Sequence, residues 1–314
     1  MKVVLQYRAS DGFRAQIAAA FADASPVLVI DETDEATFKR EMRDAAVLLH
    51  VLKPVTAAVI EAAPKLRLVQ KIGVGVNTID LDAAKAQDVA VANMPGTNSA
   101  AVAEMALALM LGVLRRTAYC DALTRAGAGW RPDLAVLDQA GEIGGRTVGL
   151  VGFGASARRL APVLAALGAR VIYTARSNHG SEVCAFRPLE ALLEEADIIS
   201  LHAPSTPATR GMIDEAALSR MRKGAVLINT ARGDLVDEVA LAAAIGSGHL
   251  RGAGLDVFAR EPAATDNPLF GLPQVLVSPH IAWLTPETLA RSLVVARENC
   301  RRLEAGEGLL HRVI

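Results

Sequence analysis

The sequence has few cysteines and no excess of positive charge. Only 3 cysteines occur among 314 residues, far apart, so we expect neither cross-links nor a bound metal. Lys and Arg total 33 against 34 Asp and Glu, which gives no electrostatic reason to expect nucleic acid or an anionic membrane as a partner. No apolar run reaches the roughly 20 residues of a membrane span, and the N-terminus lacks a signal-peptide core. We therefore expect a cytoplasmic protein.

Apolar residues are plentiful, at 52% of the chain, and they are arranged in short runs that alternate with helical patterns. This alternation is typical of parallel sheets covered by helices. One series of strands runs from "KVVLQY" to "VAVANM". A second series of six, from "TVGLVGFG" to "QVLVSPH", predicts a doubly wound nucleotide-binding domain. Between them, "SAAVAEMALALMLGVLRR" is apolar on nearly every face, so we expect a subunit contact or a seam between domains to bury it.

A glycine pattern follows the first strand of the second series. In "VGLVGFGASARR", Gly152 permits a tight turn, Gly154 lets backbone approach a pyrophosphate, and Ala157 is small enough for close helix–strand packing. The helix that begins there offers amide groups and a positive dipole end to phosphates. The strand–turn–helix order favours a dinucleotide site over a structural turn.

The next strand, "RVIYTARSN", lacks the acidic residue that usually holds the ribose of NAD. Ala175 stands near its place, which removes the repulsion of a 2′-phosphate. Arg176 can bind a phosphate with its guanidinium, and Ser177 can add a hydroxyl. We predict NADP as the cofactor, with NAD possible, although Arg176 could be an ordinary solvated residue.

At this point the sequence resembles the D-isomer-specific 2-hydroxyacid dehydrogenase family, over nearly its whole length. The motifs are "KIGVGVNTIDLDAA", "VANMPGTNSAAVAE", "VGLVGFGASARR", "LHAPSTPATRGMI", "GAVLINTARGDLVDEVAL", "GAGLDVFAREP" and "VLVSPHIAW". The "YTAR" segment looks most like the NADP-using glyoxylate/hydroxypyruvate reductases. The resemblance implies a Rossmann-type doubly wound domain, residues 98–284, inserted into a flavodoxin-like α/β substrate domain. Residues 1–97 would form that domain, and residues 285–314 would return to it.

The resemblance implies a catalytic set of Arg232, Glu261 and His280. One planar guanidinium can hold the carboxylate and carbonyl of a 2-keto acid. A histidine can supply the proton that the carbonyl oxygen needs as hydride arrives. Glu261 would orient the His280 ring and favour its charged form.

Further contacts are carried over from the same resemblance. Backbone amides of Val74, Gly75 and Val76 would receive the substrate carboxylate, and Trp283 would wall the pocket or pack in the core. Asp256 would lie near the nicotinamide, or cap a helix. The remaining expected cofactor contacts are Phe153, Ala155, Ser156, His202, Ala203, Pro204, Thr209, Thr230, Ala231 and Ala282.

The leading hypothesis is reduction of glyoxylate, hydroxypyruvate or a similar small 2-keto acid with NADPH, by a protein that is a homodimer. An NAD-preferring dehydrogenase for another 2-hydroxy acid is the nearest alternative. A dinucleotide sensor or corepressor without catalysis is a third hypothesis.

Overall fold

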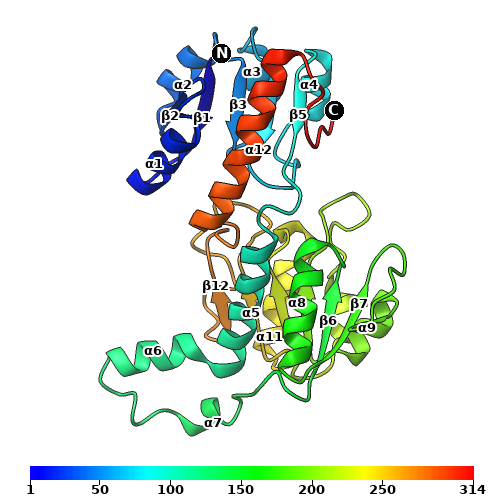
Figure 1. Ribbon diagram of the computed structural model, residues 1–314. Helices are drawn as coiled ribbons and strands as arrows, with labels where there is room; N and C mark the ends of the chain where they lie inside the picture. Colours follow the sequence, from blue (N-terminus) through cyan, green and yellow to red (C-terminus); the bar gives the residue numbers. More distant parts are fainter. The chain divides into compact units, whose positions relative to one another are not determined.

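The computed structural model describes residues 1–314. The chain divides into two compact units (Figure 1). Unit 1 comprises Met1–Asn98 and Trp283–Ile314, and unit 2 comprises Ser99–Ala282. The sequence analysis placed the boundaries after residues 97 and 284. Both units are α/β structures with parallel sheets, which confirms the predicted fold class.

Unit 1 contains a five-stranded parallel sheet with the order β2-β1-β3-β4-β5, the flavodoxin-like arrangement. Its strands are almost continuous in Val, Leu and Ile, as expected for strands that helices cover on both faces. Their bounds are β1 (Val3–Gln6), β2 (Val27–Ile30), β3 (Val47–His50), β4 (Leu68–Lys71) and β5 (Ala90–Ala92).

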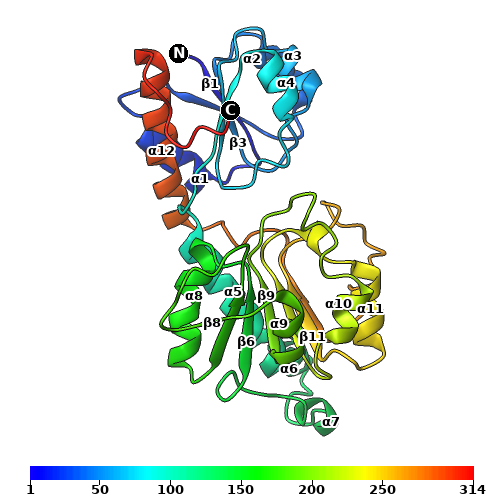
Figure 2. The same ribbon diagram turned by 90° about the vertical axis from the view of Figure 1, so that its right-hand side faces the viewer.

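Helices cover both faces of this sheet (Figure 2). The core on one face includes residues of α1 (Asp11–Ala20) and α12 (Pro286–Ala305), and the core on the other includes residues of α2 (Glu35–Met42), α3 (Ala57–Glu61) and α4 (Leu81–Ala86). Thr285 caps the start of α12 by accepting the amide of Thr288, and Gly306, at φ 69°, ends it.

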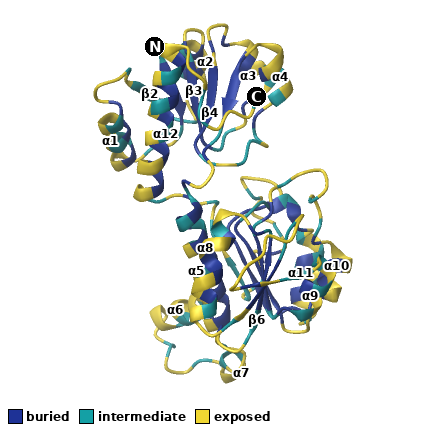
Figure 3. Ribbon diagram, turned by 45° about the vertical axis from the view of Figure 1, so that its right-hand side comes forward, coloured by how far each residue is buried: buried dark blue, intermediate teal, exposed yellow.

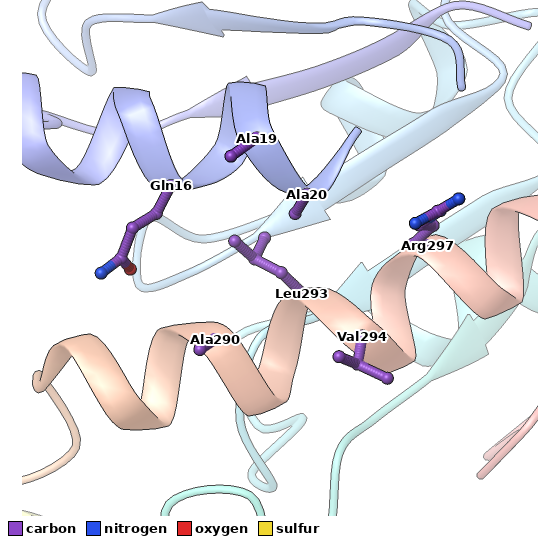
Figure 4. A pocket seen from close by; sticks show the side chains of 7 residues that line it. All are labelled: Gln16, Ala19, Ala20, Ala290, Leu293, Val294 and Arg297. Carbon is purple, nitrogen blue, oxygen red and sulfur yellow. The ribbon is translucent and has the colours of Figure 1, made fainter. Parts of the chain in front are cut away.

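A groove of about 280 Å³ lies between α1 and α12 (Figure 4). Small and apolar side chains dominate its lining, and Arg297 stands at one end. It contains none of the residues predicted from the sequence to carry chemistry.

No helix of the structure is both long and apolar enough to cross a bilayer.

Unit 2 contains a parallel sheet with the order β8-β7-β6-β9-β10-β11-β12, and the inner strands of this sheet are buried in the centre of the unit (Figure 3). The strands are β6 (Thr147–Val151), β7 (Arg170–Thr174), β8 (Ala185–Phe186), β9 (Ile198–Leu201), β10 (Val226–Asn229), β11 (Gly252–Leu255) and β12 (Val275–Val277). The prediction of six strands was wrong by one. The two residues of β8 are too few to show any periodicity.

The long apolar helix α5 (Ser99–Arg115) is buried inside unit 2. It packs on α8 (Ala155–Ala166) and on strands β10, β11 and β12. Leu109, Met110 and Val113 are among its buried residues. Contacts within the unit thus bury much of this helix, which the sequence analysis assigned to a subunit contact or a domain seam. Helices α9 (Leu189–Glu195), α10 (Glu215–Arg220) and α11 (Glu238–Gly246) cover the opposite face.

A segment after α5 has no core of its own. It includes α6 (Thr117–Arg125) and α7 (Leu134–Leu137), and none of residues 117–140 is buried. Trp130 is 88% exposed and Leu134 is 68% exposed. These two helices, of nine and four residues, are not among the elements predicted from the sequence.

Candidate active site

The residues singled out from sequence in unit 2 follow the carboxyl ends of its parallel strands. The glycine turn follows β6, Ala175 follows β7, His202 follows β9, and Arg232 lies just past β10. Asp256 follows β11 directly, and His280 follows β12 after two residues. Since the strands are parallel, all these residues lie along one edge of the sheet. The order reverses between β6 and β9, which is the point where open α/β sheets bind ligands.

The glycine turn has the shape that a dinucleotide needs. Gly152 has φ 94°, and a β-carbon there would lie 2.7 Å from the backbone of His202, so only glycine fits. Gly154 is the N-cap of α8. Glycine has no side chain that could accept the first amides of α8, so these amides remain available. No atom lies within 4 Å of a β-carbon placed on Gly154. That open space and those amides fit a pyrophosphate, while Ala157 is fully buried in the packing of α8.

His202 joins the glycine turn to the end of β9. Its Nδ1 lies 3.3 Å from the hydroxyl of Ser156, and its Nε2 lies 3.0 Å from the hydroxyl of Ser200. Burial lowers the pKa of His202 to about 4, so its ring is neutral at pH 7. The ring therefore holds the turn in place, and it is not positioned as an acid.

The end of β7 presents a free cation. Tyr173 is buried and stacks on Phe153 of the glycine turn, with 4.0 Å between ring centroids. Ala175 is half-buried, whereas Arg176 and Ser177 are exposed. Arg176 forms no ion pair or hydrogen bond with the protein, so its guanidinium is available to an anion beside the turn.

The loop after β10 brings Arg232 to the same edge. A β-carbon on Gly233 would lie 1.8 Å from the carbonyl carbon of Phe258, so glycine is required for the loop after β10 to touch the loop after β11. Arg232 donates to the carbonyl of Ala231 at 2.6 Å. Burial lowers the pKa of Arg232, and the charges of Glu261 and Asp234 oppose that effect. Gly233 carries no sequence signal for this role, because the role depends on a contact between two loops.

His280 and Glu261 are in direct contact. Nδ1 of His280 lies 2.7 Å from Oε2 of Glu261, and Oε1 of Glu261 accepts the amide of Phe258 at 3.0 Å. Burial raises the pKa of Glu261, but His280, the Phe258 amide and the charge of Arg232 outweigh it, so the pKa lies below its usual value. Glu261 is thus a carboxylate at neutral pH, and it fixes the ring of His280 so that Nε2 is free.

Asp256 anchors the loop that carries His280. Its side chain is 0% exposed, and it accepts hydrogen bonds from the Ser278 hydroxyl at 2.6 Å and from the amides of Ile281 and Ala282 at 3.0 and 2.8 Å. Its backbone carbonyl accepts the amide of His280 at 2.7 Å. His280 has φ 55°, a left-handed conformation that costs a non-glycine residue about 1–2 kcal/mol. Both carboxylate oxygens hold this loop, and neither caps a helix.

Other expected cofactor contacts occupy the same edge. The hydroxyl of Thr230 is buried and has no protein partner, so it fits a donor or acceptor from a ligand. Thr209 instead bonds to the carbonyl of Pro204 at 2.6 Å, which closes a turn after β9. Ala203 is buried against Gly152. The backbone amide of Ala231 donates to the side chain of Asn229, and that of Ala282 donates to Asp256.

The remaining expected site residues belong to unit 1. The amides of Val74, Gly75 and Val76 form no hydrogen bond with the protein, and Val74 is 44% exposed. They follow the carboxyl end of β4 and fit an anion. Trp283 is 8% exposed in the core, with its ring 6.3 Å from that of Tyr7.

Comparisons of sequence agree with these motifs. The family model for "D-isomer specific 2-hydroxyacid dehydrogenase, NAD binding domain" matches residues 107–282. A glyoxylate reductase of Korarchaeum cryptofilum is 38% identical over 85% of this chain and 82% of its own length. A D-3-phosphoglycerate dehydrogenase of Mycobacterium leprae is 42% identical over 95% of this chain. The chain spans only 56% of the length of that relative.

Solved structures share the fold over the whole chain. An NAD-dependent formate dehydrogenase from Staphylococcus aureus in complex with NAD has a TM-score of 0.88 and 28% identity, and the match covers 100% of this chain and 99% of the other. An acyclic imino acid reductase in complex with NADPH and D-Arg has a TM-score of 0.86 and 27% identity, with 100% of both chains covered.

Proposed function

The chain belongs to the D-isomer specific 2-hydroxyacid dehydrogenase family, and from that premise we propose that it reduces a small 2-keto acid, such as glyoxylate or hydroxypyruvate, with NADPH. The observation that carries the proposal is the contact of His280 with Glu261 at 2.7 Å, at the sheet edge that also holds the glycine turn. A dinucleotide sensor would have no use for a proton donor fixed in this way.

Each residue of the set has a defined task in this reaction. A nicotinamide bound at this edge would supply the hydride for the carbonyl carbon of the substrate. Nε2 of His280 donates the proton to the carbonyl oxygen, and Glu261 stabilises the charged ring that this requires. Arg232 holds the substrate carboxylate, with the amides of Val74, Gly75 and Val76 as further donors.

The proposed preference for NADPH rests on Ala175 and Arg176. Ala175 offers no carboxylate to bond the ribose 2′-hydroxyl or repel a 2′-phosphate, and Arg176 is exposed with no carboxylate partner to compete for its charge. A guanidinium is well suited to a phosphate because its donors match two phosphate oxygens. The hydroxyl of Ser177 would add a further contact.

The test is steady-state reduction of glyoxylate and hydroxypyruvate with each reduced cofactor. We expect kcat/KM to be higher with NADPH, and Arg176→Ala to lower the NADPH value by about tenfold or more, the loss of one charge-assisted hydrogen bond. The NADH value should barely change. Arg159→Ala, which removes another exposed charge from unit 2, is the control. A parent enzyme that strongly prefers NADH would refute the assignment of NADPH, and cofactor binding without turnover would favour the sensor.

Oxidation of a phosphorylated 2-hydroxy acid is the second candidate, because the relative at 42% identity is named D-3-phosphoglycerate dehydrogenase. Oxidation of phosphoglycerate with NAD should therefore be measured beside the reduction of the two keto acids. Turnover of phosphoglycerate at a higher kcat/KM than that of the two keto acids would replace our substrate assignment and keep the roles of Arg232, Glu261 and His280.

We also infer that the protein is a homodimer. Residues 117–140 have no buried side chain, and they expose Trp130 and Leu134, so a second copy would supply the contacts that this segment lacks. Sedimentation velocity should give twice the mass of the chain, and the replacement of Trp130 and Leu134 by serine should give monomers.

A further inference from the structure

Three arginines meet at the amino-terminal edge of the unit 2 sheet, opposite to the edge that holds the candidate active site. Arg116 follows α5, Arg146 precedes β6 and Arg251 precedes β11. A β-carbon on Gly141 would lie 2.7 Å from Nη2 of Arg146 and 3.3 Å from Nη1 of Arg251, so both guanidinium groups cover one backbone position. Nη2 of Arg116 lies 3.4 Å from the carbonyl oxygen of Arg251.

No carboxylate neutralises this arginine cluster, which we define as Arg116, Arg146 and Arg251. Arg116 donates to the neutral amide oxygen of Gln139 at 2.6 Å, and Arg146 donates to the backbone carbonyl of Glu142 at 2.6 Å. The side chain of Arg251 donates no hydrogen bond to the protein. The partners present are therefore neutral oxygens, which stabilise a cation less than a carboxylate does.

The guanidinium groups also retain unused donors out of contact with solvent. Arg116 is only 5% exposed, and the Nε atoms of Arg116 and Arg251 are buried without a hydrogen-bond partner. Burial lowers the pKa of Arg251, and the charges of Arg146 and Arg116 lower it further. Buried donors and adjacent like charges both cost folding free energy unless an anion compensates them.

Two acidic residues of this edge are paired with arginines outside the cluster. Asp197, which precedes β9, bonds to Arg222 at 2.9 Å. Glu195, at the end of α9, bonds to both Arg170 and Arg187. Asp138 and Glu142, which stand beside the cluster in the chain, are exposed and form no ion pair with it. The folded unit thus leaves the arginine cluster open to an anion from outside.

We propose that Arg116, Arg146 and Arg251 form a binding site for a phosphate-type oxyanion, either the free ion or the phosphate group of an ester. Planar guanidinium groups bind such oxyanions through pairs of parallel hydrogen bonds, and three of them match a charge of about two. The four residues of β11 separate Arg251 from Asp256, a distance of about 16 Å along the strand. The site is therefore separate from the candidate active site, and it does not depend on the proposed reaction.

The experiment is calorimetric titration of inorganic phosphate into the full chain at fixed ionic strength, with NADPH present to fill the glycine turn. We expect saturable binding, and Arg146→Gln and Arg251→Gln should each weaken it at least about tenfold, because each removes charge-assisted hydrogen bonds. Both arginines are half-buried at the surface, so these variants are expected to fold. Arg159→Gln, which removes an exposed charge elsewhere in unit 2, should bind phosphate like the parent.

A parallel titration with glycerol phosphate identifies the form of the ligand: tighter binding of the ester than of free phosphate would indicate an esterified ligand, and the reverse a free ion. The proposal is overturned if the parent binds neither, or if Arg146→Gln and Arg251→Gln bind phosphate as tightly as Arg159→Gln does. A third outcome also overturns it: neither compound binds, and Arg146→Gln and Arg251→Gln are monomers. In that case a carboxylate of the second copy of the chain pairs with the arginine cluster in place of a phosphate. Because these readouts are affinities, a failure of the proposed reaction would leave them unaffected.

Discussion

The substitution Asp256→Asn tests the hydrogen bonds that hold the loop of His280. In the parent, one carboxylate oxygen accepts the Ser278 hydroxyl and the Ile281 amide, and the other accepts the Ala282 amide. Asparagine keeps one oxygen acceptor, but its –NH₂ group cannot accept, so one buried donor loses its partner. A buried donor without a partner costs about 1–3 kcal/mol. For a unit of this size we expect the melting temperature to fall by roughly 2–12 °C.

The same substitution should lower reductive kcat more than it raises KM for the keto acid. The reason is that this loop positions the ring of His280, whereas the proposed function assigns substrate binding to Arg232. Ser278→Ala is the matched control, because it removes only one of the three donors and leaves both amide bonds in place. If the melting temperature of Asp256→Asn stays within about 1 °C of that of the parent, less than the smallest expected fall, and the variant retains its kcat, then the loop does not depend on Asp256.

Two further predictions concern pH. Glu261→Gln should move the alkaline limb of the reductive pH profile to lower pH, because a neutral amide replaces the carboxylate that contacts His280; an unchanged profile would argue against the pairing. In unit 1, burial, assisted by the charge of Lys71, lowers the pKa of His50 from 6.5 to about 3. The unfolded chain therefore gains a proton below pH 6.5 while the folded chain does not, so stability is lost as pH falls from 6.5 toward 3. Between pH 7 and 5, urea unfolding of the parent should lose about 2 kcal/mol more than that of His50→Gln, and equal losses would contradict this.

The sequence predicts the two sheets and the glycine turn well, because their signals are local. Val, Leu and Ile mark the buried strands, and Gly152 and Gly154 stand at fixed positions after β6. In contrast, Arg232, Glu261 and His280 were chosen through the resemblance to a family. No local signal separates Glu261 from a solvated glutamate, and its contact with His280 bridges 19 residues.

Features that depend on contacts between distant segments were not predicted. Asp256 was expected beside the nicotinamide, but its hydrogen bonds to the loop after β12 could not be foreseen from spacing. Gly233 reads as an ordinary turn glycine until the loop of Phe258 is placed against it. The arginine cluster combines residues 116, 146 and 251, and no sequence pattern links them.

Unit 2 is one uninterrupted stretch of the chain, and unit 1 is assembled from the two flanking stretches. A recombinant gene could thus exchange residues 99–282 for the matching stretch of a relative with only two junctions. Such a graft would carry the glycine turn, Arg176 and His280 together as one cassette, while the Val74–Val76 loop stayed native. Nucleotide preference would in this way be exchanged together with Arg232, Glu261 and His280, while the amides of Val74, Gly75 and Val76 remained those of the parent.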